Sequence, residues 1–235
     1  MPPFEDLYEP CVSCRAPCND VLNANTNPRV DDRYIPRGFY SDAQPGEPVL
    51  MFLAMNPGGG RGGLLEPPGY YAVNHPRNVL DVHRAFLDEQ FNRPRRGFHR
   101  KLKLQVSAFL NVPTEVAMRF AVFTELFKCT TPGDGMASPQ TVDRCVELHL
   151  TREIREWQPL AVIPLGEAVR NWIAEHPAVF HGIPVIRLMH PSYYGRNDEE
   201  FRQEAAAAFE RLPIDTQIRI RQILADAEHE EQCYF

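Results

Sequence analysis

Four short apolar runs divide this chain and constrain its fold more than any other feature. They are VLMFLAM (49–55), FAVFTELF (120–127), PLAVIPL (159–165) and PVIRLM (184–189). Each is rich in Val, Ile, Leu and Phe without clean alternation, which is typical of strands buried on both faces. Helix-like segments lie between and after them, at 79–91, 97–110, 139–157, 166–176 and 200–212. This alternation predicts an α/β fold, with a central parallel four-stranded sheet flanked by helices in an α/β/α sandwich.

The length allows one large domain or two small ones, and the composition suits a globular core. The chain has 235 residues, of which 43% are hydrophobic and 24% charged. We therefore expect a single domain over 1–235, with an N-terminal segment at 1–48 and a C-terminal helix and tail at 213–235. The formal net charge of −6 argues against a surface coated in positive charge, so any nucleic-acid binding needs a local basic patch.

No membrane or export signal is expected. The sequence has no run of 18 apolar residues, and MPPFEDLYEP at the N-terminus lacks the apolar segment of a signal peptide. We therefore expect a cytoplasmic protein with no membrane partner. Thiols stay reduced in that compartment, so clustered cysteines are more often metal ligands than disulfides.

Each predicted strand is followed by a segment suited to a binding site: NPGGGRGG (56–63), KCTTPGDG (128–135), GEA (166–168) and HPSYYGRN (190–197). Ligands of open parallel sheets bind just beyond the carboxyl ends of the strands, so we expect these four loops to form one site. Asn56 either faces a ligand or belongs to an ordinary turn. His190 is either a charge-stabilising imidazole or a structural one. The Gly-rich run lacks the GxxxxGK[ST] pattern of a phosphate-binding loop.

Six cysteines are present, and five of them fall into two groups. Cys11, Cys14 and Cys18 lie within eight positions, whereas Cys129 and Cys145 are separated by fifteen residues. Three interpretations fit this spacing: buried core cysteines, a zinc site of four thiolates, or an iron–sulfur cluster. The sixth cysteine, in the C-terminal tail, is expected to be uninvolved.

The order of these motifs resembles a known family. In order they are C-x2-C, a strand with an NPG loop, KC-x2-PG, a second Cys after fifteen intervening residues, LG-x-A, and a strand followed by HPS. The motifs follow one another as in the uracil-DNA glycosylase superfamily, in particular its iron–sulfur family 4 branch. The resemblance covers residues 8–212 and is strongest in FTELFKCTTPGDGMASPQTVDRCVEL and REWQPLAVIPLGEAV. It implies the glycosylase-like fold and a structural [4Fe–4S] cluster. The implied ligands are Cys11, Cys14, Cys129 and Cys145, with Cys18 as an alternative for one of the first two.

The same resemblance implies the residues that act on a flipped base. AMNPG is similar to the GINPG motif of the mismatch-specific thymine/uracil glycosylases, where the Asn positions the attacking water, whereas family 4 has GEAPG at this motif. That role falls to Asn56, and His190 would hydrogen-bond the pyrimidine O2. Tyr71, or its neighbour Tyr70, would stack on the base.

Further residues complete the implied site. Met55 and Gly58, beside Asn56, would contact the base. Arg61, Ser192, Tyr193 (or Tyr194) and Arg196 would contact DNA, with one of the tyrosines filling the space that the base leaves. The basic stretch RPRRGFHRKLK (93–103) is either a phosphate-binding patch or a solvated helix face.

One position departs from the family pattern. TNVVK in the family is TELFK here, so Glu125 replaces the Asn that reads the edge of uracil. An ionised carboxylate only accepts hydrogen bonds, whereas an amide also donates. An amino group such as that of cytosine or adenine would suit the carboxylate better, and protonation through burial would partly restore a donor.

Three functions follow as expectations. The first is a monomeric DNA glycosylase, a hydrolase that flips out and excises a deaminated or damaged base in base-excision repair. The second is a non-catalytic iron–sulfur member of the same superfamily that binds nucleic acid. The third is a zinc-stabilised domain of unrelated function.

Overall fold

The computed structural model describes residues 4–30, 34, 36–43, 47, 49–56, 97–193 and 195–233, and all structural statements refer to them. Three parallel strands form the sheet: β1 (Leu50–Ala54), β2 (Ala121–Glu125) and β3 (Ala161–Pro164). Their order is β2-β1-β3, with Leu50 opposite both Ala121 and Ala161. The α/β class and the parallel sheet flanked by helices are therefore confirmed.

The expected fourth strand does not form. Within 184–189, only Val185 makes a bridge, to Val162 of β3, with hydrogen bonds from Val162 N–H to the Pro184 carbonyl and from Ile186 N–H to the Val162 carbonyl, both 2.9 Å. The next donor in a parallel ladder would be the N–H of Pro164, which proline lacks. The segment therefore lies beside β3 in the right direction but cannot extend the sheet.

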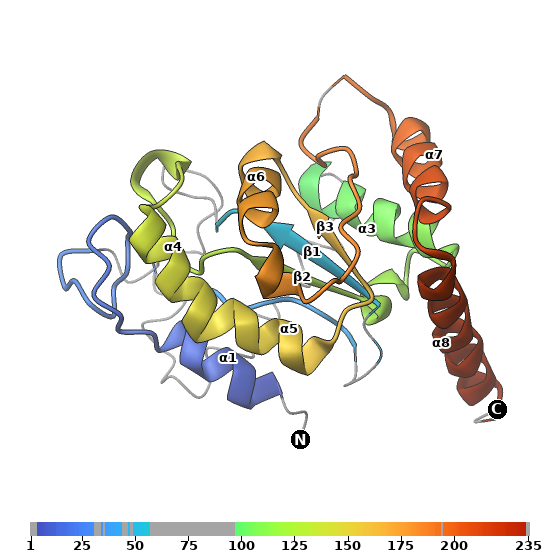
Figure 1. Cartoon of the computed structure of the whole chain (residues 1–235), viewed down its shortest axis with the longest axis horizontal. Coiled ribbons are helices and arrows are strands. Elements are labelled where there is room, and N and C mark those ends of the chain that lie inside the picture. Colours follow the sequence, from blue (N-terminus) through green and yellow to red (C-terminus); the bar gives the residue numbers. More distant parts are fainter. Residues whose placement is uncertain are drawn as a thin grey trace.

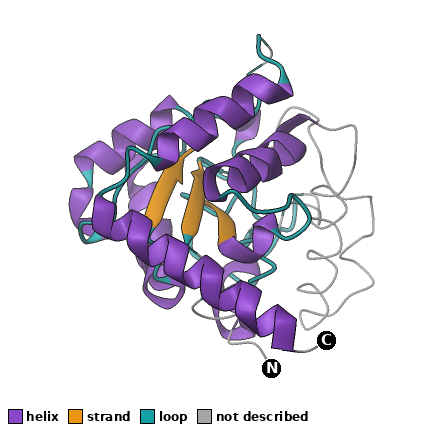
Figure 2. Ribbon diagram, turned by 90° about the vertical axis from the view of Figure 1, so that its right-hand side faces the viewer, coloured by secondary structure: helices purple, strands orange, loops and turns teal. Residues whose placement is uncertain are grey.

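Helices cover both faces of the sheet, and Figure 1 shows the two groups on opposite sides of the strands. One group is α3 (Gly97–Leu110), α7 (Asp198–Phe209) and α8 (Ile214–Cys233). The other is α1 (Phe4–Val12), α4 (Pro139–Cys145), α5 (Thr151–Trp157) and α6 (Glu167–Glu175). Figure 2 shows the strands enclosed between these layers. Short 3₁₀ segments lie at Ala117–Phe120, Pro132–Asp134 and Pro177–Phe180.

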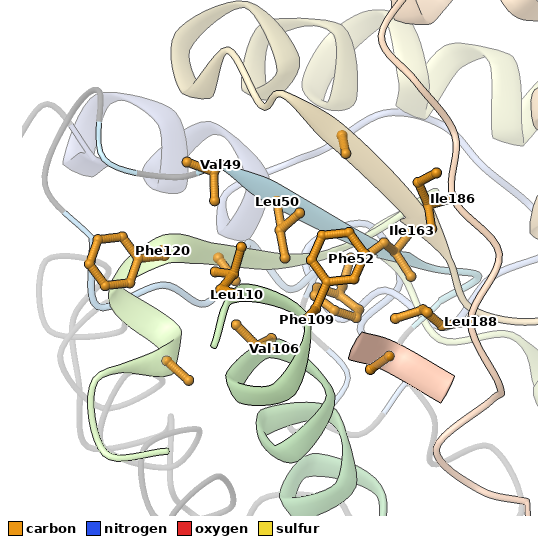
Figure 3. Packing of buried hydrophobic residues seen from close by; sticks show 14 of the residues in the cluster. Val49, Leu50, Phe52, Val106, Phe109, Leu110, Phe120, Ile163, Ile186 and Leu188 are labelled. Atoms are coloured by element: carbon orange, nitrogen blue, oxygen red, sulfur yellow. The ribbon is translucent and has the colours of Figure 1, made fainter. Parts of the chain in front are cut away.

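Each face of the sheet has its own apolar core because successive strand residues point to opposite sides. Leu50 and Phe52 pack into the core beside α3, where Figure 3 shows Phe52 close to Phe109. Met51 and Leu53 pack into the core on the other side. All four side chains are fully buried, which explains why the strand sequences lack alternation.

The helix predicted at 139–157 is present but interrupted. It begins after Ser138, whose Oγ accepts from the Thr141 N–H at 3.4 Å, with Pro139 in the first turn. A π-helical turn, Val146–Leu150, follows α4 directly and leads into α5. Helix α1 was not predicted. No helix in the described part of the chain is long and apolar enough to cross a membrane.

Candidate functional site at the carboxyl edge of the sheet

The loops after the strands meet at the carboxyl edge of the sheet. Asn56, just beyond β1, donates through Nδ2 to Thr131 Oγ1 of the loop after β2, at 3.2 Å. Gly166, which follows β3, has a φ of +101°, and a Cβ at this position would lie 3.9 Å from the His190 ring. Asn56 therefore contacts the loop after β2, and His190 lies beside the backbone of Gly166, after β3. That all four loops form one site stays a prediction.

The tautomer of His190 is set by a backbone contact. The N–H of Ser192 donates to Nδ1 of His190 at 3.1 Å. Because Nδ1 accepts, a neutral ring carries its proton on Nε2 and presents that N–H as a donor. Burial lowers the pKa of His190, which favours this neutral form near pH 7. The Phe98 ring of α3 lies 5.8 Å from the imidazole and supports it from one side.

Glu125 ends β2 and is buried at this edge, with 6% of its surface exposed. Burial raises its pKa to about 7, an effect that Lys128 and Arg37 oppose and Glu153 reinforces. Its side chain shares a face of the sheet with Phe123, two residues earlier. Close to pH 7 the carboxyl group is therefore divided between a protonated form that can donate and an ionised form that only accepts.

His99 of α3 belongs to the same neighbourhood, and the sequence did not single it out. Its ring packs edge-on against Phe98 at 5.0 Å and against Phe123 at 6.1 Å. Burial, together with Arg37, lowers its pKa to about 4, so this imidazole is neutral at pH 7. Arg37 acts on His99 and on Glu125, so this guanidinium lies near both groups.

The other face of β2 carries a buried ion pair. Lys128 Nζ lies 2.8 Å from each carboxylate oxygen of Glu153 on α5, and donates to Thr124 Oγ1 at 2.5 Å. Thr124 in turn donates to Glu153 Oε2 at 2.7 Å. Burial alone would lower the pKa of Lys128, but the charges of Glu153, Cys11 and Glu125 and the hydrogen bond to Glu153 together hold that pKa above its ordinary value. Lys128 is therefore a buried cation.

Four cysteines line one pocket beside this pair. Cys14, Cys18, Cys129 and Cys145 line a small cavity of about 20 Å³, together with Lys128 and His149. Burial raises the pKa of Cys129 well above its ordinary range, and the charges of Cys145, Cys14 and Cys18 raise it further. Burial likewise raises the pKa of Cys145 to about 12. The chain thus gathers thiols that repel one another once ionised, an arrangement that a bound cation stabilises.

Cys11 occupies a different environment from the other thiols. It is fully buried and does not line the pocket. Its S–H lies 3.5 Å from the Leu7 carbonyl and 3.7 Å from Glu153 Oε1. Cys18, the alternative in the sequence-based ligand set, does line the pocket. In the described part of the chain, no three Cys, His, Asp or Glu side chains lie close enough together to hold a single metal ion.

His149 also lines this pocket, and burial, with Lys128 and Arg152, lowers its pKa to about 4. Neither His149 nor the Lys128–Glu153 pair was identified from the sequence.

The expected DNA contacts are partly engaged within the protein. Arg196 is exposed and pairs with Glu200 at 2.7 Å, while Ser192 and Tyr193 are exposed in the same loop. In the basic stretch, Arg100 pairs with Asp198 through two hydrogen bonds of 2.5 and 2.7 Å.

Lys103 is buried rather than presented to solvent, whereas Lys101 donates to the Tyr193 carbonyl at 3.0 Å. Met55 follows β1, and its carbonyl accepts from the Phe127 N–H at 3.2 Å. The remaining predicted contacts, Gly58, Arg61, Tyr70, Tyr71, Tyr194 and residues 93–96, lie outside the described residues and stay predictions.

No profile of a known protein family matches the chain, and no curated protein matches its sequence. The assignment of function therefore depends on the chemistry of this edge and of the thiol pocket.

Proposed function

We propose that the protein is a DNA glycosylase that hydrolyses the N-glycosidic bond of a deaminated or damaged base. The observation that carries the proposal is the fixed tautomer of His190, together with the positions of Asn56 and Glu125 at the carboxyl ends of the neighbouring parallel strands β1 and β2. Glycosylases must draw the base out of the duplex, read its polar edge and stabilise the departing base, and these residue types supply the last two tasks.

In the proposed reaction the bond between sugar carbon and base nitrogen breaks, and its electron pair leaves with the base. The His190 Nε2–H donates to the base carbonyl oxygen on which the negative charge develops. Asn56 holds the water whose oxygen forms the new bond to the sugar carbon, and the proton that this water loses neutralises the departing base. Its amide orientation is restrained by the hydrogen bond to Thr131. Glu125 reads the base edge, and its protonation state decides whether it donates or only accepts.

We further propose that Cys14, Cys18, Cys129 and Cys145 hold a [4Fe–4S] cluster. Four thiols around one pocket fit such a cluster, which binds one cysteine at each iron and so needs no convergence of three ligands on a single ion. Bound there, the cluster would tie the N-terminal segment to α4 and to the loop after β2. Cys11 is left out because it does not line that pocket, and its thiol contacts Glu153 at 3.7 Å.

The test is a single-turnover assay on oligonucleotides that contain uracil, hypoxanthine or xanthine, with release of the base as the readout. The parent protein is expected to excise at least one of them. His190→Ala is expected to lower that rate by about 10²–10³-fold, the usual cost of losing one donor to a developing anion. His229→Ala, an exposed histidine on α8, is the matched control and should retain the parent rate.

No abasic product from any substrate, with iron and sulfide bound, would refute glycosylase activity. Salt-dependent binding to DNA without turnover would then favour the non-catalytic alternative. Absence of iron and sulfide from the purified parent would refute the cluster but would leave the test of excision intact.

A further inference from the structure

One buried histidine has no assigned role in the proposed reaction. His149 is only 5% exposed, and neither ring nitrogen has a hydrogen-bond partner among the residues that the structure describes. Buried polar groups are nearly always paired, so an unpaired imidazole calls for a missing partner. By contrast, the Nδ1 atoms of His176 and His190 are each paired with backbone, at 2.8 and 3.1 Å.

The missing partner is indicated by the pocket that His149 lines. The same pocket is lined by Cys14, Cys18, Cys129 and Cys145. His149 therefore faces the space in which the proposed cluster would lie. The role of His149 rests on the proposed iron–sulfur site.

The local backbone is an independent observation that points the same way. The π-helical turn Val146–Leu150 begins directly after Cys145 and contains His149. Such turns interrupt α-helices rarely, and they occur often at functional sites. The wider turn changes the direction of His149 relative to Cys145, and both side chains line the pocket.

We propose that His149 donates a ring N–H to a sulfur atom of the cluster, either a cysteine thiolate or a bridging sulfide. An imidazole carries at least one N–H in either protonation state, so the donor is always present. Four thiols already surround the pocket, which leaves His149 as a hydrogen-bond donor rather than a ligand. Hydrogen bonds to the sulfurs help to set the reduction potential of such clusters. Reduction adds one negative charge, so a donor at this position stabilises the reduced form and raises the potential.

The experiment compares the full-length parent with His149→Leu and His149→Gln, each reconstituted with iron and sulfide without oxygen. Iron and sulfide per chain are measured first, and the midpoint potential is then measured by protein-film voltammetry. All three proteins are expected to hold the cluster. His149→Leu should have a more negative potential than the parent, and His149→Gln, which keeps an N–H donor, should recover much of the difference. His229→Leu is the control and should match the parent.

An unchanged potential in His149→Leu would overturn the inference and leave the cluster in place. Loss of iron from His149→Leu, with the far-ultraviolet circular dichroism of the parent retained, would show direct coordination and would also overturn it. Absence of iron from the parent would refute the cluster itself, a failure that the first measurement separates from the others.

If His149→Leu does not fold, the parent alone still gives a test. Electron–nuclear double resonance of its reduced cluster, before and after exchange into D₂O and with ¹⁵N-labelled histidine, should detect an exchangeable proton on a histidine nitrogen. Its absence would overturn the inference.

Discussion

Replacement of Glu125 by Gln should change the dependence of stability on pH. Burial raises the pKa of Glu125 from 4.5 to about 7. The folded protein therefore keeps a proton that the unfolded chain releases, and folding becomes less favourable as pH rises from about 4.5 to 7. At 1.36 kcal/mol per pH unit, this interval corresponds to a loss of about 3 kcal/mol in the free energy of unfolding. The glutamine has no proton to lose and should be free of this decline.

The assay is urea denaturation of the parent and Glu125→Gln at several pH values between 5 and 8, with the metal content of the two proteins matched. The difference between their free energies of unfolding should move by up to about 3 kcal/mol in favour of the variant as pH rises. Subtraction removes groups common to both proteins. Among these is His99, whose lowered pKa makes stability fall as pH drops from 6.5 towards 4. Glu115→Gln, at an exposed position, is the control.

Parallel curves for parent and Glu125→Gln would refute the reasoning, because they would mean that Glu125 titrates alike in the folded and unfolded states. If the curves separate, excision can be compared over the same range. A protonated carboxyl group both donates and accepts, as an amide does. Excision of uracil by the parent should therefore fall above about pH 7, whereas that by Glu125→Gln should not show this fall.

Three further predictions concern the ligand set, the buried ion pair and a helix cap. Cys18→Ser should lose most of its iron while Cys11→Ser keeps it, because only Cys18 lines the pocket; equal iron in both variants would contradict this assignment. Glu153→Gln should cost about 3–5 kcal/mol in urea denaturation, because it removes the carboxylate that lies 2.8 Å from the buried Lys128 ammonium group, and a loss below about 1 kcal/mol would contradict that account. Asn197→Ala should lower stability by about 1 kcal/mol, seen as a lower melting temperature, because it removes the capping box of α7; an unchanged melting temperature would count against it.

The sequence was most informative where local pattern decides structure. The three strands fall inside their apolar runs, and the segment 97–110 forms α3 with the predicted bounds. The fourth strand was wrong because strand formation depends on the neighbour as well as on the segment. PVIRLM has strand-like residues, but the N–H it would need from β3 belongs to a proline.

The sequence predicted the location of the site from the sheet topology, but not the contacts of its side chains. Parallel strands bring their following loops to one edge, and so Asn56 and His190 could be expected there. The tautomer of His190 could not be predicted, because it depends on the backbone N–H of Ser192 in the loop that follows. Similarly, Lys128 and Glu153 are 25 residues apart and pair only because α5 packs against β2. No spacing pattern in the sequence predicts such an ion pair.

Lys128 acts both on Glu125 at the carboxyl edge of the sheet and on the thiol pocket. Its charge lowers the pKa of Glu125 at the edge of the sheet and that of Cys145 in the thiol pocket, while its ammonium group is held by Glu153. Because one buried cation serves all three groups, a change in the charge of the pocket alters the field at Glu125. A cluster that adds negative charge near Lys128 would offset the positive potential that Lys128 produces at Glu125. The protonated form of Glu125 would then be favoured. The protonation of the base-reading residue is therefore expected to differ between the cluster-loaded and the metal-free protein, with the higher Glu125 pKa in whichever form carries more negative charge in the pocket.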